Sequence, residues 1–121
     1  MKIKVKRELE LWYALLRILP GEEIVYNGYF SWLVSGTTGP LQLDFFMPNL
    51  KIGVEIMGIQ HYKFTPWIHK NMANFRALKQ RDKIKAAILK EKGIALIIFD
   101  YKDKLTEANI RDKLQEAGIE Y

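Results

Sequence analysis

Two short apolar runs in the middle of the chain carry the alternating pattern of hydrophobic and polar positions that is typical of β-strands. The runs are Leu41–Met47 and Ile52–Met57, and each contains one acidic residue, Asp44 in the first and Glu55 in the second. A turn-forming pair, Pro48-Asn49, separates them. The pattern therefore predicts a β-hairpin whose two faces are largely apolar.

The register of this hairpin decides whether its two carboxylates meet. A two-residue turn at Pro48-Asn49, or a four-residue turn reaching Lys51, places Asp44 and Glu55 on the same face, whereas a three-residue loop separates them. Carboxylates that face each other among apolar residues repel and lose solvation, and a divalent metal ion is the usual compensation. In the alternative without a metal, Asp44 lies at a hydrated strand end and Glu55 pairs with a lysine.

Helical periodicity predicts a first helix over residues 6–19. Leu9, Trp12, Leu16 and Leu19 recur at three- and four-residue spacing, and Pro20-Gly21 ends the pattern. Glu8 lies at the margin of an apolar stripe, because Leu11, Trp12 and Leu15 follow it at i+3, i+4 and i+7. An acid in the first turn also favours the helix dipole, which would explain Glu8 without any function.

A second, longer helix is predicted over Phe75–Lys92 and is closed by Gly93. Asp82 shares a helical line with Leu78, Ala86 and Leu89, so we expect it to face the packed side. A buried acid is unfavourable unless it is paired. Asp82 should therefore orient a neighbour by a hydrogen bond, a role that would suit the support of a catalytic histidine.

The remaining patterns complete the expected architecture. Thr65-Pro66 predicts a helix start, with Trp67–Asn71 left open as a separate short helix. We expect a strand or hairpin at the sheet edge over Glu22–Val34, a central strand covered on both faces over Ile94–Phe99, and a last helix from Thr106 to Ala117. The predicted fold is an α/β sandwich with a central mixed sheet and the element order αβββαβα.

The 121 residues, of which 49% are hydrophobic, suit one compact domain with a sizeable core. The chain contains no cysteine, so disulfides and thiolate metal sites are excluded. No apolar run approaches the length needed to span a membrane. We therefore expect a soluble, intracellular, cytoplasmic protein without a membrane partner.

The charge of the chain favours a polyanionic partner. Nineteen lysines and arginines face 14 acids, for a formal net charge of +5. Many cations crowd the predicted long helix, where contacts with DNA phosphates are the obvious use and a solvated helix face is the alternative. They are Lys70, Arg76, Lys79, Arg81, Lys83, Lys85, Lys90 and Lys92.

Four segments together resemble the PD-(D/E)XK nuclease superfamily, and most closely its very-short-patch-repair-like branch, which includes phage-type homing endonucleases. They cover most of the chain in the order of that family: ELELWYALLR from Glu8, the Asp44 strand, GVEIMGIQHY from Gly53, and QRDKIKAAILKEKGIALIIF from Gln80. The resemblance implies a restriction-endonuclease-like fold over residues 1–121. It also implies a phage or mobile-element origin, association with the nucleoid, and possible use as the catalytic domain of a longer protein or as a homodimer.

The activity that the resemblance implies is metal-dependent hydrolysis of DNA phosphodiester bonds, with an essential set of Glu8, Asp44, His61 and Asp82. Asp44 and Glu55 would hold Mg²⁺, or Mn²⁺ in its place, with Glu8 as the alternative second ligand. His61 would be the general base or a phosphate contact. Gln60 would position water or phosphate, the DNA-binding lysines would be Lys79, Lys83 and Lys85, and His69 would be structural.

Met57 departs from the parent superfamily, which carries a lysine two residues after its strand glutamate. His61, or a lysine reaching in from elsewhere, would have to replace that lysine. The departure also keeps a competing hypothesis open, a catalytically silent DNA-binding or assembly module of the same fold. A third hypothesis is a structure-selective enzyme such as a junction resolvase, for which a dimer is expected.

Overall fold

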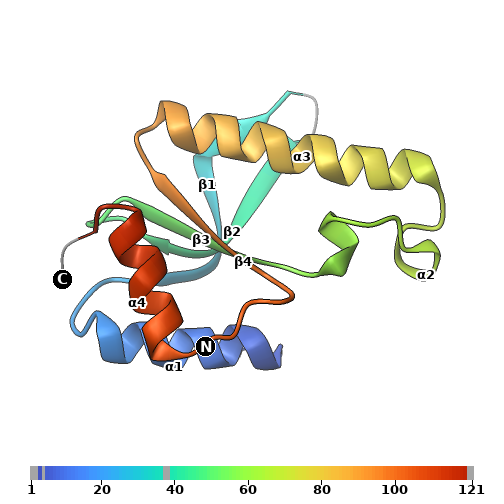
Figure 1. Cartoon of the computed structure of the whole chain (residues 1–121). Helices are drawn as coiled ribbons and strands as arrows, with labels where there is room; N and C mark the ends of the chain where they lie inside the picture. The colour runs from blue at the N-terminus through green and yellow to red at the C-terminus, as the bar shows by residue number, and fades with distance from the viewer. Residues whose placement is uncertain (1–2, 4, 37–38, 120–121) are drawn as a thin grey trace.

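A mixed four-stranded sheet lies between helices in the computed structural model, which describes residues 3, 5–36 and 39–119 (Figure 1). Helix α3 (Met72–Glu91) covers one face of the sheet. Helices α1 (Lys6–Ile18) and α4 (Glu107–Glu116) cover the other face. The predicted α/β class with a mixed sheet is confirmed.

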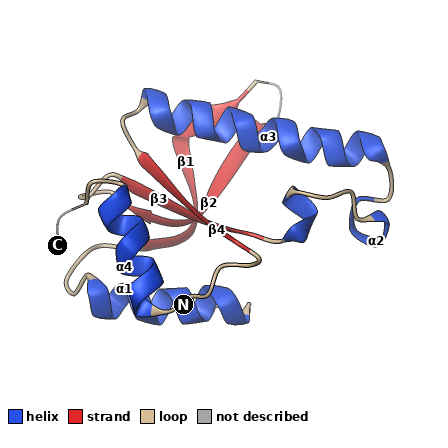
Figure 2. Ribbon diagram, viewed as in Figure 1, coloured by secondary structure: helices blue, strands red, loops and turns tan. Residues whose placement is uncertain are grey.

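The strands lie side by side in the order in which they occur along the chain (Figure 2). They are β1 (Val25–Ser35), β2 (Gly39–Met47), β3 (Ile52–Met57) and β4 (Ala95–Asp100). The pairs β1–β2 and β2–β3 are antiparallel, and β4 runs parallel to β3. The parallel pair requires a long crossover, which α3 provides.

The central hairpin has the four-residue turn that was one of the two arrangements predicted to bring its acids together. Met47 pairs with Ile52, which leaves Pro48–Lys51 as the turn. The same register, continued one pair beyond Phe45–Val54, places Asp44 opposite Glu55. The alternative of a three-residue loop is therefore wrong.

The edge segment before this hairpin is a single strand, so its reading as a hairpin is wrong. Asn27-Gly28 resembles a turn signal, but Asn27 adopts a φ of 55° inside β1 and the strand continues on both sides of it. Asparagine tolerates this left-handed conformation better than most residues. The pair therefore distorts the strand and does not reverse it.

Helix α1 confirms only part of the predicted stripe, because Leu19 is buried and Trp12 packs against the core but the other two leucines do not. Leu11, Leu15 and Ile18 pack into the core, while Leu9 and Leu16 are exposed. Apolar residues occupy more than half of the circumference of this helix, so periodicity alone fits two overlapping stripes. Leu15 belongs to the core cluster that also contains Phe45 of the hairpin, and the Trp12 ring stacks on Phe45.

Strand β4 is an edge strand, and its predicted central position is wrong. Its side chains do contribute to both faces, since Ile97 and Phe99 pack with α1 and α4 while Leu96 packs with α3. An unbroken apolar run reports that helices cover both faces of a strand. It carries no information about whether a further strand lies beside it.

The chain between β3 and α3 forms a short 3₁₀ helix, η1 (Ile59–His61), and a separate four-residue helix, α2 (Pro66–His69). Thr65 precedes α2, but its hydroxyl donates to the Lys63 carbonyl and does not cap the helix. Helix α3 begins earlier than predicted because Asn71 caps it, accepting from the Asn74 amide at 2.8 Å. Helix α4 starts at Thr106 as predicted, with its side chain accepting from Asn109.

Among the residues that the structure describes, no helix is both long and apolar enough to cross a membrane.

The corrected stripe of α1 yields a paired test on two adjacent leucines. Leu15 is 1% exposed and Leu16 is 40% exposed. Replacing Leu15 by Ala should lower the free energy of unfolding by about 2–5 kcal/mol, because it leaves a cavity in the core. Leu16→Ala should lower it by less than about 1 kcal/mol, as expected of a surface position. Urea denaturation of both variants measures this, and equal losses would contradict the observed packing of α1.

Candidate active site

A polar cleft of about 380 Å³ opens between the central hairpin and α3. Five of the residues singled out in the sequence line it: Asp44, Glu55, His61, Asp82 and Lys85. They come from β2, β3, η1 and α3, which are far apart along the chain. The fold therefore brings most of the predicted site into one solvent-accessible place.

Asp44 lies at a break in the alternation of β2, where successive odd-numbered residues pack on opposite faces of the sheet. Leu43 belongs to the core cluster beneath α3, whereas Phe45 belongs to the cluster beneath α1. Asn27, with its positive φ, falls opposite Asp44 when the register between β1 and β2 is continued. The Asp44 carboxylate is held by the Ile56 amide, which donates to Oδ2 at 2.7 Å. This bond joins the two strands at the site and fixes the carboxylate.

Glu55 is only 6% exposed and has two partners. Lys85 of α3 forms an ion pair with Oε1, and the Asp44 carboxyl is within hydrogen-bonding reach. Burial, and after it the negative charge of Asp44, raise the pKa of Glu55 from 4.5 to about 8, although the Lys85 ammonium lowers it. Near neutral pH the protonated form of Glu55 is therefore favoured.

His61 and Asp82 form the second pair of the cleft. The Asp82 Oδ2 lies 2.8 Å from His61 Nδ1. A carboxylate accepts, so Nδ1 carries the hydrogen and Nε2 is left as the nitrogen that can take up a proton. Lys79 fixes the backbone of η1 by donating to the His61 carbonyl at 3.3 Å. The pairing is the one expected if Asp82 supports a histidine.

Glu8 is not among the described residues that line the cleft. Its Oε1 accepts a 2.6 Å hydrogen bond from the Tyr26 hydroxyl of β1. This bond, helped by burial and by the charges of Glu8 and Asp44, raises the pKa of Tyr26 to about 12. Glu8 is thus held by Tyr26 and, among the described residues, forms no hydrogen bond or ion pair with a side chain that lines the cleft.

The predicted DNA-contacting residues occupy different places. Lys79 and Lys83 line a neighbouring groove of about 250 Å³ that shares the His61–Asp82 pair with the cleft. The Gln60 side chain folds back over Gly58, so close that a Cβ there would lie 2.3 Å from its Oε1. Lys85 is engaged by Glu55 in this structure. His69, predicted to be structural, is buried and hydrogen-bonded on both ring nitrogens.

The donor set suits a magnesium ion held by two carboxylates. Within residues 3, 5–36 and 39–119, no three His, Asp or Glu side chains gather in a group that would hold a metal. Mg²⁺ is commonly bound through one or two carboxylates and completes its shell with water and phosphate oxygens. Asp44 and Glu55 supply two such ligands, and because burial and the Asp44 charge raise the pKa of Glu55, a positive charge between the two would be favourable.

Lys85 was assigned in the sequence to DNA contacts and was also a candidate for the lysine that reaches the site from elsewhere, but its pairing with Glu55 was not specified. A signal was present, because Lys85 follows Asp82 by three residues and therefore shares its helical face. The metal-free alternative had Glu55 paired with a lysine, and that contact exists. Its other half is wrong, since Asp44 lies inside β2 and not at a hydrated strand end. Tyr26 carried no signal that would have linked it to Glu8.

The raised pKa of Glu55 predicts how stability depends on pH without metal. Between pH 4.5 and about 8 the folded chain holds a proton that the unfolded chain has released, so stability should fall as pH rises through this window. We expect a loss on the order of 2 to 4 kcal/mol, since one pKa unit is worth about 1.4 kcal/mol. Urea denaturation in EDTA from pH 5 to 8.5 measures it.

The variant Glu55→Gln should flatten this pH dependence because the amide cannot titrate. Glu10→Gln, which changes an exposed glutamate of α1, is the matched control and should leave the slope unchanged. A slope of equal size in Glu55→Gln would show that another group titrates.

Comparison with known proteins relates the chain to viral proteins. It is 38% identical over 88 residues to uncharacterized protein 307L of Invertebrate iridescent virus 6, which is 71% of this chain and 45% of that protein. It is 35% identical over 71 residues to uncharacterized protein 033L of Invertebrate iridescent virus 3 (59% and 37%). It is 34% identical over 95 residues to uncharacterized protein 094L of Frog virus 3 (77% and 59%).

The chain spans about half the length of the curated relatives it matches. No protein-family model matches it, and no solved structure matches it significantly.

Proposed function

We propose that this chain is a metal-dependent DNA endonuclease domain of the PD-(D/E)XK type. The observation that carries the proposal is the convergence of two opposed carboxylates, a lysine and a carboxylate-supported histidine in one open cleft. These are the groups needed to bind a divalent cation, contact a phosphate and accept a proton. The element order and the mixed sheet between two helical layers are compatible with a restriction-endonuclease-like sandwich.

Asp44 and Glu55 would hold Mg²⁺ or Mn²⁺. When bound, such an ion supplies a positive charge that polarises the scissile phosphate and lowers the pKa of a coordinated water. The protein contributes a fixed pair of ligands, because the Ile56 amide holds Asp44 and Lys85 holds Glu55. The mostly buried position of the pair strengthens every charge interaction made there.

Lys85 takes the role that Met57 leaves empty. Its ammonium reaches the strand glutamate from α3, and it has three donors of which Glu55 engages one. The remaining donors can contact a phosphate oxygen or a water molecule in the cleft. A lysine supplied by the helix thus replaces one supplied by the strand.

His61 is the proposed general base. Asp82 fixes the Nδ1–H tautomer and stabilises the imidazolium that forms when Nε2 takes a proton from water. Arg81 on the wall of the cleft and Lys79 and Lys83 in the adjoining groove would contact the DNA backbone on either side of this pair. Glu8 has no direct contact with metal or DNA in this scheme, and its role is to hold the Tyr26 hydroxyl of β1.

The catalytically silent DNA-binding module is the second candidate, and the ion pair of Lys85 with Glu55 favours it. That pair already compensates one of the two charges that a metal would compensate. A binding module would retain DNA affinity and show no metal-dependent cleavage. The experiment below separates the two candidates.

The central test is cleavage of supercoiled plasmid with Mg²⁺ or Mn²⁺, beside an EDTA control. The parent chain should nick or linearise the plasmid, and Asp44→Asn should lower the rate at least about 100-fold, because a neutral amide is a poor metal ligand. The asparagine oxygen can still accept from the Ile56 amide, so DNA affinity and melting temperature should change little. Equal cleavage by Asp44→Asn would place the metal elsewhere.

The roles of His61 and Lys85 are tested by single-turnover rates. His61→Ala should lower the rate by about 100- to 10,000-fold, the usual range for a positioned general base, and should remove the acid limb of the pH–rate profile. Lys85→Gln should also slow cleavage, whereas Lys90→Gln, on the exposed side of the same helix, should not. Full activity of His61→Ala with an inactive Lys85→Gln would assign the essential proton transfer to the lysine.

A further inference from the structure

Exposed apolar side chains concentrate in one short stretch of the chain. Among the described residues, six of the twelve large apolar side chains that are exposed lie between residues 59 and 72, a segment we call the α2 tip. Trp67 is 81% exposed, the highest value among the twelve. The other five are Ile59, Tyr62, Phe64, Ile68 and Met72. Such a patch indicates an interaction surface.

A longer stretch that includes the α2 tip, residues 56–81, carries the charge excess of the whole chain. Residues 56–81 contain five cations and no acid: Lys63, Lys70, Arg76, Lys79 and Arg81. The remaining residues contain 14 cations and 14 acids, so they are balanced. An aromatic patch set in an all-cationic segment favours a partner that is both anionic and able to stack.

The α2 tip is rigidly tied to α3. The Thr65 amide donates to His69 Nδ1 at 2.9 Å, which leaves the ring hydrogen on Nε2 to be donated to the Gln60 carbonyl at 2.8 Å. The Asn74 side chain donates to the His69 carbonyl at 2.7 Å, and the ring of Phe75 packs on that of His69. The α2 tip therefore holds the backbone of Trp67 in a fixed position relative to α3.

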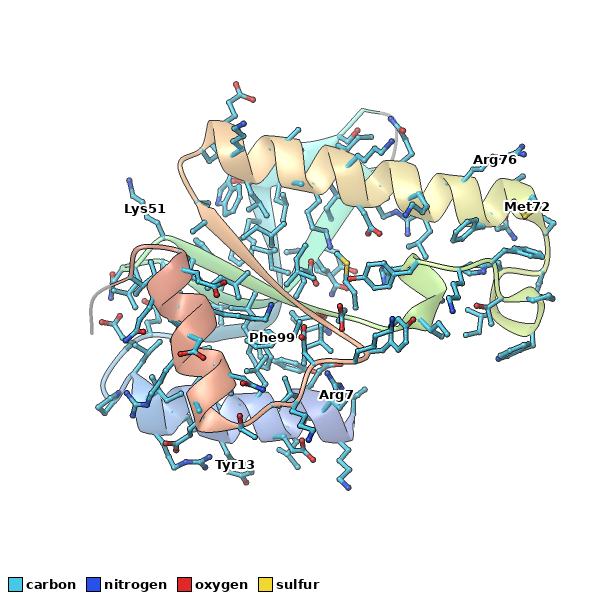
Figure 3. All side chains as sticks on the ribbon, in the orientation of Figure 1. Arg7, Tyr13, Lys51, Met72, Arg76 and Phe99 are labelled. Atoms are coloured by element: carbon cyan, nitrogen blue, oxygen red, sulfur yellow. The ribbon has the colours of Figure 1, made fainter. Side chains whose placement is uncertain are left out.

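The α2 tip is continuous along the chain with the candidate active site. It begins at η1, which carries His61, and it packs below the start of α3, beyond the end of the sheet (Figure 1). Met72 and Arg76 mark this outer end of the molecule, remote from Tyr13 on α1 (Figure 3). His61 therefore lines the cleft and also belongs to the segment that carries the exposed aromatic side chains.

We propose that the α2 tip binds single-stranded DNA, with an unpaired base stacked on Trp67 and the flanking phosphates contacted by Lys63 and Lys70. The proposal deepens the proposed function, on which it rests for the position of the scissile bond, by assigning DNA with an unpaired segment as the substrate class. In a duplex the base faces are already stacked on one another and cannot cover an indole. A four-residue helix is too short to lie along a membrane as an amphipathic helix.

Binding is measured in EDTA, where cleavage does not interfere, by the anisotropy of a labelled oligo(dT) of about 12 nucleotides, the length scale of single-strand sites. The parent should prefer it to a blunt duplex hairpin of equal length. Trp67→Ala should weaken single-strand binding by about 5- to 100-fold, the range for losing one stacked base, and duplex binding less than about 2-fold. Trp67→Phe, which keeps a ring, should recover much of the loss.

Two further measurements test whether the Trp67 ring itself stacks on the DNA bases. Oligo(dT) should quench tryptophan emission in the parent and not in Trp67→Phe, because Trp12 and Trp32 are half-buried. Tyr13→Ala, which removes a 54% exposed ring from α1, is the control and should bind like the parent. Equal affinity of the parent for both DNA forms, or an unchanged Trp67→Ala, would overturn the proposal.

Other partners give distinct results. Self-association lost in Trp67→Ala by sedimentation, with unchanged single-strand binding, would assign the tip to a protein interface. Trp67-dependent binding of anionic lipid vesicles without single-strand binding would assign it to a membrane surface. Plasmid cleavage retained by a protein without single-strand preference overturns this inference alone, whereas Trp67-dependent binding with unaltered cleavage by Asp44→Asn contradicts the proposed metal site alone.

Discussion

The buried pair of carboxyl groups on the central hairpin is the constraint on which the rest of the structure depends. Two acids opposed between apolar layers are unfavourable unless a proton, a cation or a metal ion lies between them. Here the raised pKa of Glu55 favours its protonated form near neutral pH, and the Lys85 ammonium lies against its carboxyl group. That ammonium belongs to α3, so the crossover helix must pass directly over the hairpin, and Asp82 is carried over η1 with it. The compensation of one buried charge thus assembles the cleft.

Features of the fold that arise from neighbouring residues could be predicted from the sequence. The hairpin followed from alternation and its turn residues, with two-, three- and four-residue connections left open, and the packed side of Asp82 followed from its helical line. Features that depend on distant contacts could not. The buried face of α1 depends on packing against strand residues that are distant in the chain, such as Phe45, and the edge position of β4 depends on the absence of another strand beside it in the described sheet.

The site shows the same division. Acidic residues in apolar strands are conspicuous, so Asp44 and Glu55 could be singled out. A lysine among many lysines on one helix is not conspicuous, and only the crossing of α3 over β3 separates Lys85 from its solvated neighbours. Glu8 was singled out through the resemblance to nucleases. The Tyr26 hydroxyl that donates to it belongs to β1, which distorts at Asn27. Such a distortion leaves no periodic signal.

Under the proposed function, the lysine of the site comes from helix α3 and not from strand β3, and this changes which element fixes the geometry of the site. Were the cation carried by β3 in place of Met57, it would keep its position relative to Glu55 whatever α3 did. With Lys85, one rigid helix sets the ammonium, the support of His61 through Asp82, and the cationic wall at Arg81. These residues lie within two turns of α3, so a rotation or slide of that helix displaces them together. The α2 tip, tied to the start of α3 through His69 and Asn74, would move with it. Under the proposed function, contacts with DNA at the tip and the geometry of the cleft are therefore coupled through α3.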